Sequence, residues 1–195
     1  SQLLLAPFNL TSGKICAILD GVMGNNVDYA DIYFEYGRSE GWSLEEGIVK
    51  SGSFNIDQGV GFRAVSGEKT AFAYSDDISL EALESAGNTV KAIGSGHSGQ
   101  TAQKFGVGFS EKPLYGTSDP LMSIGDGQKV GLLRKIEGFA RGLDSRVTQV
   151  NVSLGGEYKV VLMARNDGKI VADVRPLVRL SVQVVVDENG RREQG

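Results

Sequence analysis

Residues 60–74 read VGFRAVSGEKTAFAY, and two short alternating runs flank the segment Ser66-Gly67-Glu68 within them. Apolar side chains stand at every second position of each run, which is typical of a strand with one buried face. These positions are Val60, Phe62 and Ala64 before the segment, and Phe72 and Tyr74 after it. The stretch therefore predicts a β-hairpin, because glycine in a short polar segment favours a tight reversal of the chain.

The same alternation extends in both directions along the chain. It occurs in residues 32–36, 42–44 and 54–56, and again in 150–154, 158–162, 170–174 and 178–186. We interpret the segments between these runs, which are rich in Gly, Asp and Ser, as turns or bulges. They are residues 37–41, 52–53, 57–59, 155–156 and 166–168, and Pro176. The pattern predicts antiparallel meanders with one buried face.

Three further segments carry apolar residues at helical spacing, and we expect helices at residues 12–24, 79–93 and 124–143. The expected caps are Thr11 or Ser12, then Asp77, then Ser123 with Asp126 as a capping box. In the last helix the side chains expected to face the sheet are Val130, Leu133, Ile136, Ala140 and Leu143. Runs of strands with helices between them predict an α+β fold, with antiparallel or mixed β meanders packed against two to three helices. We expect residues 1–195 to form a single domain.

The composition is that of a folded protein, with 41% apolar residues, 23% charged residues and a net charge of -4. The basic residues are scattered, so we expect neither nucleic acid nor a membrane as a partner. No window approaches the roughly 20 apolar residues that span a bilayer. The single cysteine, Cys16, lies on an apolar helix stripe, where an inert core residue is expected. Together these features predict a cytoplasmic protein.

The sequence ends at Gly195, shortly after a further turn signal, Asp187-Glu188-Asn189-Gly190. A returning strand is expected to begin at Arg191. Because a long apolar strand at the edge of a sheet favours unwanted pairing, we expect the chain to be the N-terminal domain of a longer protein.

Few residues offer catalytic or metal-binding chemistry. His97 is the only histidine, which excludes a two-histidine metal site, and we interpret it as a solvated loop residue. Residues 94–99 fit G-x-G-x-x-G but follow a predicted helix, so we interpret them as part of a long loop, 94–120. The pairs Glu45-Glu46 and Asp76-Asp77 lie at element boundaries, where adjacent side chains point apart. We therefore predict no catalytic residue and no metal ligand in this chain.

The segment Asn55–Arg63 interrupts the strand pattern with three polar residues and two glycines. Such a segment is typical of a bulge at which another backbone approaches closely, and a purely structural turn is the simpler alternative.

At this segment the sequence resembles a known family. The run Glu46–Thr70, the segment Asp173–Val182, and Pro113-Leu114-Tyr115 with Asp119-Pro120 are similar to the N-terminal domain of the TldD/PmbA family of bacterial metalloproteases. The resemblance covers nearly the whole chain, and it is closer to the TldD subunit than to its partner PmbA, also called TldE. It implies a cytosolic zinc peptidase that works as a TldD–PmbA heterodimer or as a homodimer. The implied substrates are small or unfolded polypeptides, including peptide antibiotics that it matures.

In that family an H-E-x-x-x-H motif and a later cysteine in the C-terminal domain hold the zinc, and the Glu would activate a zinc-bound water. None of these positions occurs here, so the resemblance implies zinc in the parent protein, no cofactor in this chain and no activity of this domain alone. The roles left for it are assembly with a partner subunit and control of substrate access. The candidate residues for lining a substrate channel are Asn55, Asp57, Gln58 and Arg63. The alternative is a self-contained peptide- or protein-binding module without catalysis.

Overall fold

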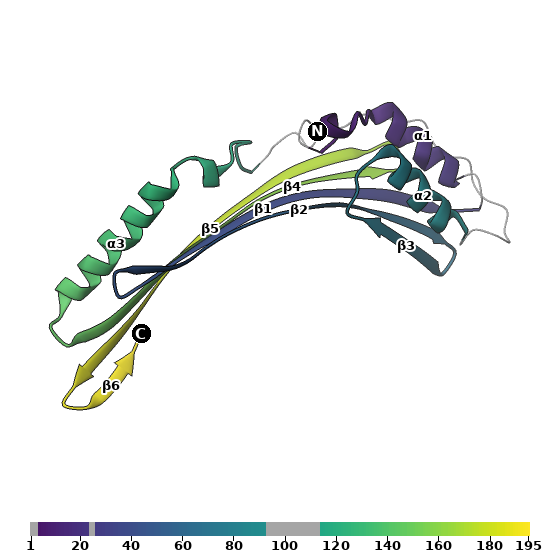
Figure 1. Cartoon of the computed structure of the whole chain (residues 1–195). Coiled ribbons are helices and arrows are strands. Elements are labelled where there is room, and N and C mark those ends of the chain that lie inside the picture. Colours follow the sequence, from purple (N-terminus) through teal and green to yellow (C-terminus); the bar gives the residue numbers. More distant parts are fainter. Residues whose placement is uncertain (1–3, 24–25, 93–113) are drawn as a thin grey trace. The chain divides into compact units, whose positions relative to one another are not determined.

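The computed structural model describes residues 4–23, 26–92 and 114–195 (Figure 1). Six strands form one sheet, in the order β3-β2-β1-β4-β5-β6. The elements are η1 (Ala6–Phe8), α1 (Ser12–Met23), β1 (Tyr29–Glu45), β2 (Ile48–Ser66), β3 (Lys69–Ser75), α2 (Leu80–Lys91), η3 (Pro120–Met122), α3 (Asp126–Leu143), β4 (Val147–Arg165), β5 (Ile170–Glu188) and β6 (Arg191–Gln194). The predicted α+β fold with antiparallel strands is confirmed.

The hairpin predicted from residues 60–74 is present. β2 and β3 pair in antiparallel register, with Val60 opposite Ser75 and Ser66 opposite Lys69. Gly67 has a φ of 57°, in the left-handed region that favours glycine. The predicted reversals at 166–168 and before Arg191 are also confirmed, since β4 ends at Arg165 and β6 begins at Arg191.

The other positions interpreted as turns or bulges do not reverse the chain. β1, β2, β4 and β5 run without interruption through residues 37–41, 52–53, 57–59, 155–156 and Pro176. At Gly52 a Cβ would lie 3.1 Å from the ring of Trp42, and at Gly41 it would lie 3.0 Å from Ser53 Oγ. These glycines make room for a side chain on the neighbouring strand and do not reverse the chain.

The chain divides into two compact units, and the four long strands β1, β2, β4 and β5 pass from one to the other. Unit 1 comprises residues 1–37, 57–116 and 159–174. Unit 2 comprises residues 38–56, 117–158 and 175–195. Each unit has its own helices and its own buried cluster.

In unit 1, α1 and α2 pack against one another on one face of the sheet (Figure 1). A Cβ at Gly87 of α2 would lie 3.4 Å from Ile18 and Val22 of α1 and 3.5 Å from the ring of Phe62 in β2, so three elements meet there. The largest buried side chains of this core include Ile15, Leu19, Ile32, Phe34, Phe62, Leu83 and Leu162. Cys16 is half-buried on α1 and not part of this core, which corrects the expected position.

Side-chain oxygens cap both helices of unit 1. The Lys14 N–H donates to Thr11 Oγ1 over 3.3 Å, as predicted, and the Ala82 N–H donates to Ser79 Oγ over 3.2 Å. Asp77 was expected to cap α2, but the capping residue is Ser79, two positions later. The Asp77 carboxylate accepts hydrogen bonds from the N–H and the hydroxyl of Ser79, so it orients the residue that caps α2.

In unit 2, α3 covers one face of the sheet. Its buried cluster contains Leu44, Leu133, Ala140, Val150 and Val152, with Trp42, Ile136 and Leu154 partly buried around it. α3 begins at Asp126, and the capping box expected at Ser123 is wrong. Gly125 is the cap, and its N–H donates to Gln128 Oε1 over 3.0 Å.

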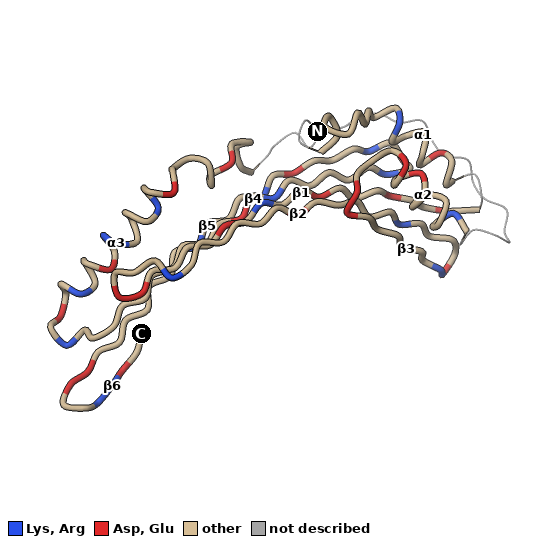
Figure 2. Tube along the Cα trace, in the orientation of Figure 1, with Lys and Arg blue, Asp and Glu red and all other residues tan. Residues whose placement is uncertain are grey.

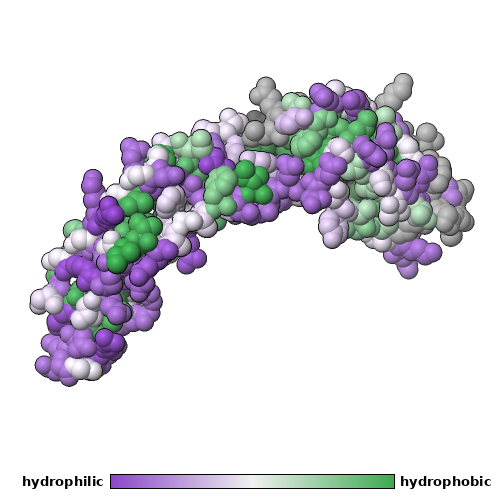
Figure 3. Space-filling model, viewed as in Figure 1, coloured by the Kyte–Doolittle hydropathy of each residue, from purple (hydrophilic) through white to green (hydrophobic). Residues whose placement is uncertain are grey.

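The outer side of α3 is also apolar. Leu132, Phe139 and Leu143 are 40%, 70% and 69% exposed, and Figure 3 shows hydrophobic residues gathered over this helix. The helical spacing predicted that Leu143 faces the sheet, and this prediction is wrong. On β2 and β3 the side chains of Phe54, Ile56, Phe72 and Tyr74 are exposed as well, so the alternation of apolar residues at these positions does not mark buried core.

Several predictions fall on residues outside the described ranges. They concern the last residue of the helix expected at 12–24, His97, the segment 94–99 and most of the loop 94–120. None of the helices in the described ranges is long and apolar enough to cross a bilayer.

Candidate functional site

A groove lies in unit 1 on the sheet face that α1 and α2 leave uncovered. Phe62 and Ala64 of β2 are buried, so Gly61 and Arg63 between them point to the opposite face. Tyr74 and Phe72 of β3 pair with these two residues and therefore share that face. The groove has a volume of about 660 Å³. Its lining consists of Tyr33, Glu35, Asp57, Gln58, Gly59, Val60, Gly61, Phe72, Tyr74, Ser75 and Asp76.

Two glycines set the shape of this groove. A Cβ at Gly59 would lie 2.9 Å from the carbonyl oxygen of Ser75, which no real side chain tolerates. A Cβ at Gly61 would lie 3.0 Å from the ring of Phe72, so this ring lies across the glycine. The close approach of another backbone, expected for the segment Asn55–Arg63, is thus present at Gly59 inside an unbroken strand.

The polar part of the lining is acidic. It contains three carboxylates, Glu35, Asp57 and Asp76, and no lysine or arginine. The Tyr33 hydroxyl donates to Glu35 Oε2 over 2.7 Å, and Lys159 Nζ, outside the lining, lies 3.1 Å from Glu35 Oε1. The groove therefore offers carboxylates beside exposed aromatic rings.

The structure separates the four predicted channel residues. Asp57 and Gln58 line the groove. Arg63 lies on the same sheet face but is bound to Asp31, and Asn55 belongs to unit 2. The groove thus brings together two of the four candidates.

Arg63 belongs to a network around Asp31, which is 6% exposed. Its guanidinium donates to both carboxylate oxygens of Asp31, and Tyr29 Oη donates to Asp31 Oδ2 over 2.7 Å. Arg63 and Arg165 both lie over the Tyr29 ring, at 5.4 Å and 5.7 Å from its centroid. Burial, and then the hydrogen bond to Asp31, raise the pKa of Tyr29, while the bond to Asp31 raises the pKa of Arg63. Arg63 is therefore engaged by Tyr29 and Asp31 of β1.

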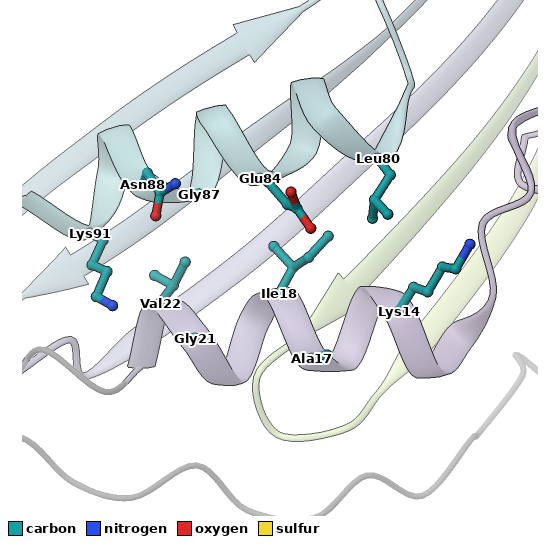
Figure 4. Close-up of a pocket in the computed structure, with 10 residues that line it drawn as sticks. All are labelled: Lys14, Ala17, Ile18, Gly21, Val22, Leu80, Glu84, Gly87, Asn88 and Lys91. Carbon is teal, nitrogen blue, oxygen red and sulfur yellow. The ribbon is translucent and has the colours of Figure 1, made fainter.

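A second hollow, of about 380 Å³, lies between α1 and α2 (Figure 4). Ile18, Val22 and Leu80 point into it, and Lys14, Glu84 and Lys91 stand at its rim (Figure 4). Lys14 Nζ already donates to the carbonyl oxygen of Asn9 over 2.8 Å. With mixed charges and an apolar floor, this hollow indicates no particular ligand.

Sequence reasoning missed a buried ion pair in unit 2. Lys129 Nζ lies 2.6 Å from Glu40 Oε1, with side chains 4% and 7% exposed, and it donates to the Leu121 carbonyl over 2.8 Å. Glu40 had been placed in a turn at 37–41. Extending the alternation of Trp42 and Leu44 by two residues would have placed Glu40 on the buried face and revealed the need for a partner.

Within the described residues, no three His, Cys, Asp or Glu side chains come close enough to hold a metal ion. Basic and acidic residues are intermixed along the chain (Figure 2), and many form ion pairs such as Arg141–Glu46 at 2.6 Å and Arg38–Asp119 at 3.1 Å.

Two family profiles match this chain. Residues 30–94 match the one described as PmbA/TldA metallopeptidase domain 1, and residues 119–195 match the PmbA/TldA metallopeptidase central domain. The chain belongs to the PmbA/TldD metallopeptidase family.

Within that family, curated relatives point to TldD. The Metalloprotease TldD homolog of Haemophilus influenzae is 45% identical over 197 residues, and that of Buchnera aphidicola subsp. Schizaphis graminum is 38% identical over 195 residues. Each match covers 100% of this chain but 41% and 40% of the relative. The chain thus spans about two fifths of the length of these relatives.

Solved structures share the fold. A Thermotoga maritima protein assigned as a modulator of a DNA gyrase gives a TM-score of 0.72 at 15% identity, over 95% of this chain and 42% of the other. TldE from Thermococcus kodakarensis gives 0.68 at 14% identity, over 91% and 40%.

Proposed function

We propose that this chain is the N-terminal, non-catalytic part of a TldD-like zinc metallopeptidase that cleaves small or unfolded polypeptides. The observation that carries the proposal is the 45% identity to a Metalloprotease TldD homolog over the whole chain, which covers two fifths of that relative. The only histidine is His97, so an H-E-x-x-x-H motif cannot occur in these residues. The zinc and the water it activates would belong to the remaining part of such a protein.

In this proposal the present residues serve assembly and substrate access. The fold shared with TldE supports pairing with a homologous TldE-like subunit, as a heterodimer, or with a second copy. The half-buried free thiol of Cys16 suits the reducing cytoplasm in which we place the protein.

The proposed substrate passage includes the groove at Asp57 and Gln58. β3 is the outermost strand at one end of the sheet order, and an extended polypeptide can add to such an edge by main-chain hydrogen bonds. The groove lies directly beside this edge strand, because Phe72, Tyr74 and Ser75 line it.

The test uses the full-length protein with its partner subunit. We expect it to contain about one zinc per catalytic subunit and to cleave an unfolded polypeptide, with both properties lost on chelation. The present 195 residues alone should bind no zinc and cleave nothing. A full-length protein that contains no metal and cleaves no polypeptide would overturn the proposal and leave the self-contained binding module.

The passage has its own test. Asp57→Ala with Gln58→Ala should raise the KM for an unfolded polypeptide and leave zinc content and assembly unchanged, because both residues line the groove and both are exposed. Unchanged cleavage by this variant would remove both residues from the passage.

A further inference from the structure

The groove of unit 1 has a lining that selects by charge. Three of its side chains are carboxylates and none is basic, although lysine and arginine are frequent elsewhere on the strands (Figure 2). Asp76 is exposed, and its Cα would lie 3.7 Å from a Cβ placed on Gly59. Asp57 lies two residues before Gly59, on the same face of β2. A ligand with a positive charge would therefore meet carboxylates from both β2 and β3.

The aromatic rings beside these carboxylates are open to solvent. Tyr74 is 82% exposed, Phe72 is 64% exposed and Tyr33 is 37% exposed. Exposed ring faces attract cations, and guanidinium groups more often than ammonium groups. The same chain uses this contact elsewhere, since Arg38 lies 4.9 Å from the centroid of Phe54 and Arg63 lies 5.4 Å from that of Tyr29.

The position of the groove favours an extended ligand. Its aromatic wall belongs to β3, whose other side pairs with β2 in a regular antiparallel ladder. A strand added to the edge of β3 would project every second side chain over the face that carries Phe72 and Tyr74.

We infer that this groove binds extended polypeptide segments through arginine or lysine side chains, which lie against Tyr74 and Phe72 and pair with Asp76 and Asp57. The inference rests on the proposed function, in which this domain meets polypeptides before cleavage, and it adds a preference for cationic segments. Such a preference predicts that binding weakens as salt is added, because screening acts on exposed charges.

Two matched peptides test the inference on the full-length protein, with EDTA present to prevent cleavage. Both are extended and rich in Val and Thr, and one carries arginine at alternate positions where the other carries neutral citrulline. Fluorescence anisotropy should show tighter binding of the arginine peptide. Tyr74→Ala and Asp76→Asn should each weaken that binding by about two- to fivefold, the range of a single exposed cation–π or ion-pair contact.

Two control variants remove the same kinds of side chain at positions outside the groove. Tyr115→Ala removes another exposed tyrosine and Asp20→Asn another exposed carboxylate, neither of which lines the groove, and both should bind like the wild type. Equal affinity for the two peptides, or wild-type affinity of both groove variants, would overturn the inference. The proposed function is tested separately. It requires that the same protein, without EDTA, contains zinc and cleaves the citrulline peptide or an unfolded polypeptide.

Discussion

At the scale of single residues, buried charges specify where α3 lies on its part of the sheet. Lys129 lies between Glu40 of β1 and the carbonyl of Leu121, and Asp126 Oδ1 is 3.7 Å from its Nζ. A buried ion pair gives little net stability over apolar side chains of similar size, but removing one partner leaves the other charge buried and unpaired. The pair therefore disfavours any other register of α3.

Lys129→Met should lower the free energy of unfolding by about 3–5 kcal/mol, because Glu40 is then buried without a partner. Urea unfolding measures this change. Lys129→Met combined with Glu40→Leu should recover much of the loss, and Lys135→Met, at an exposed position of the same helix, should change stability by less than about 0.5 kcal/mol. A double variant as unstable as the single one would show that the pair does not act as a unit.

Cys16 provides a prediction about pH. Burial, and then the negative charge of Asp20, raise the pKa of its thiol. Since the thiolate is the reactive form, alkylation by iodoacetamide at pH 8 should be slower than for the urea-unfolded chain and should accelerate as the pH rises. Asp20→Asn should lower the thiol pKa and so speed the reaction at pH 8. Equal rates for folded and unfolded protein would contradict the raised pKa.

At the scale of elements, the alternation of apolar residues located β1 to β5 but not their lengths, and the turn before Arg191 located β6. Glycine and polar residues inside β1, β2 and β4 resemble turn signals, yet Gly52 lies under Trp42 and Gly61 lies under Phe72. Such glycines match a large side chain on the neighbouring strand, and that match is invisible until the register of the two strands is known. For the same reason, Asp57 and Gln58 could be singled out from the sequence, whereas their aromatic neighbours on β3 could not.

Two glycine substitutions should change the stability of the protein in opposite directions. Gly59→Ala should destabilise the protein, because its Cβ would lie 2.9 Å from the backbone oxygen of Ser75 and would push β3 away. Gly138→Ala on α3, where a Cβ would meet nothing within 4 Å, should stabilise the protein by up to about 1 kcal/mol. Thermal unfolding of the two variants measures both changes in stability. A neutral Gly59→Ala would mean that β3 can move away from β2 without cost.

At the scale of the whole molecule, the same four strands run through both compact units. β1, β2, β4 and β5 each contribute residues to both. Cooperative unfolding is the expected consequence, although each unit has its own helices and its own core.

The only tryptophan, Trp42, reports on unit 2 and tests this cooperativity. Phe62→Ala, in the core of unit 1, should shift the urea midpoint of Trp42 fluorescence downward together with the far-ultraviolet circular dichroism signal, by a stability loss of about 3–5 kcal/mol. Phe139→Ala, an exposed position in unit 2, should leave both midpoints nearly unchanged. A fluorescence midpoint that stays in place while circular dichroism shifts would mean that the units unfold independently.

The pairing of β1 with β4 has a consequence for synthesis on the ribosome. The Asn166 N–H donates to the carbonyl oxygen of Ala30 over 2.9 Å, and these two residues are 136 positions apart. At about 5–20 residues per second, a nascent chain carries β1 for roughly ten seconds before its neighbour emerges. During that wait the β1–β2–β3 meander exposes one long unpaired edge, so early translation is the period in which this protein is most open to aggregation and to chaperones.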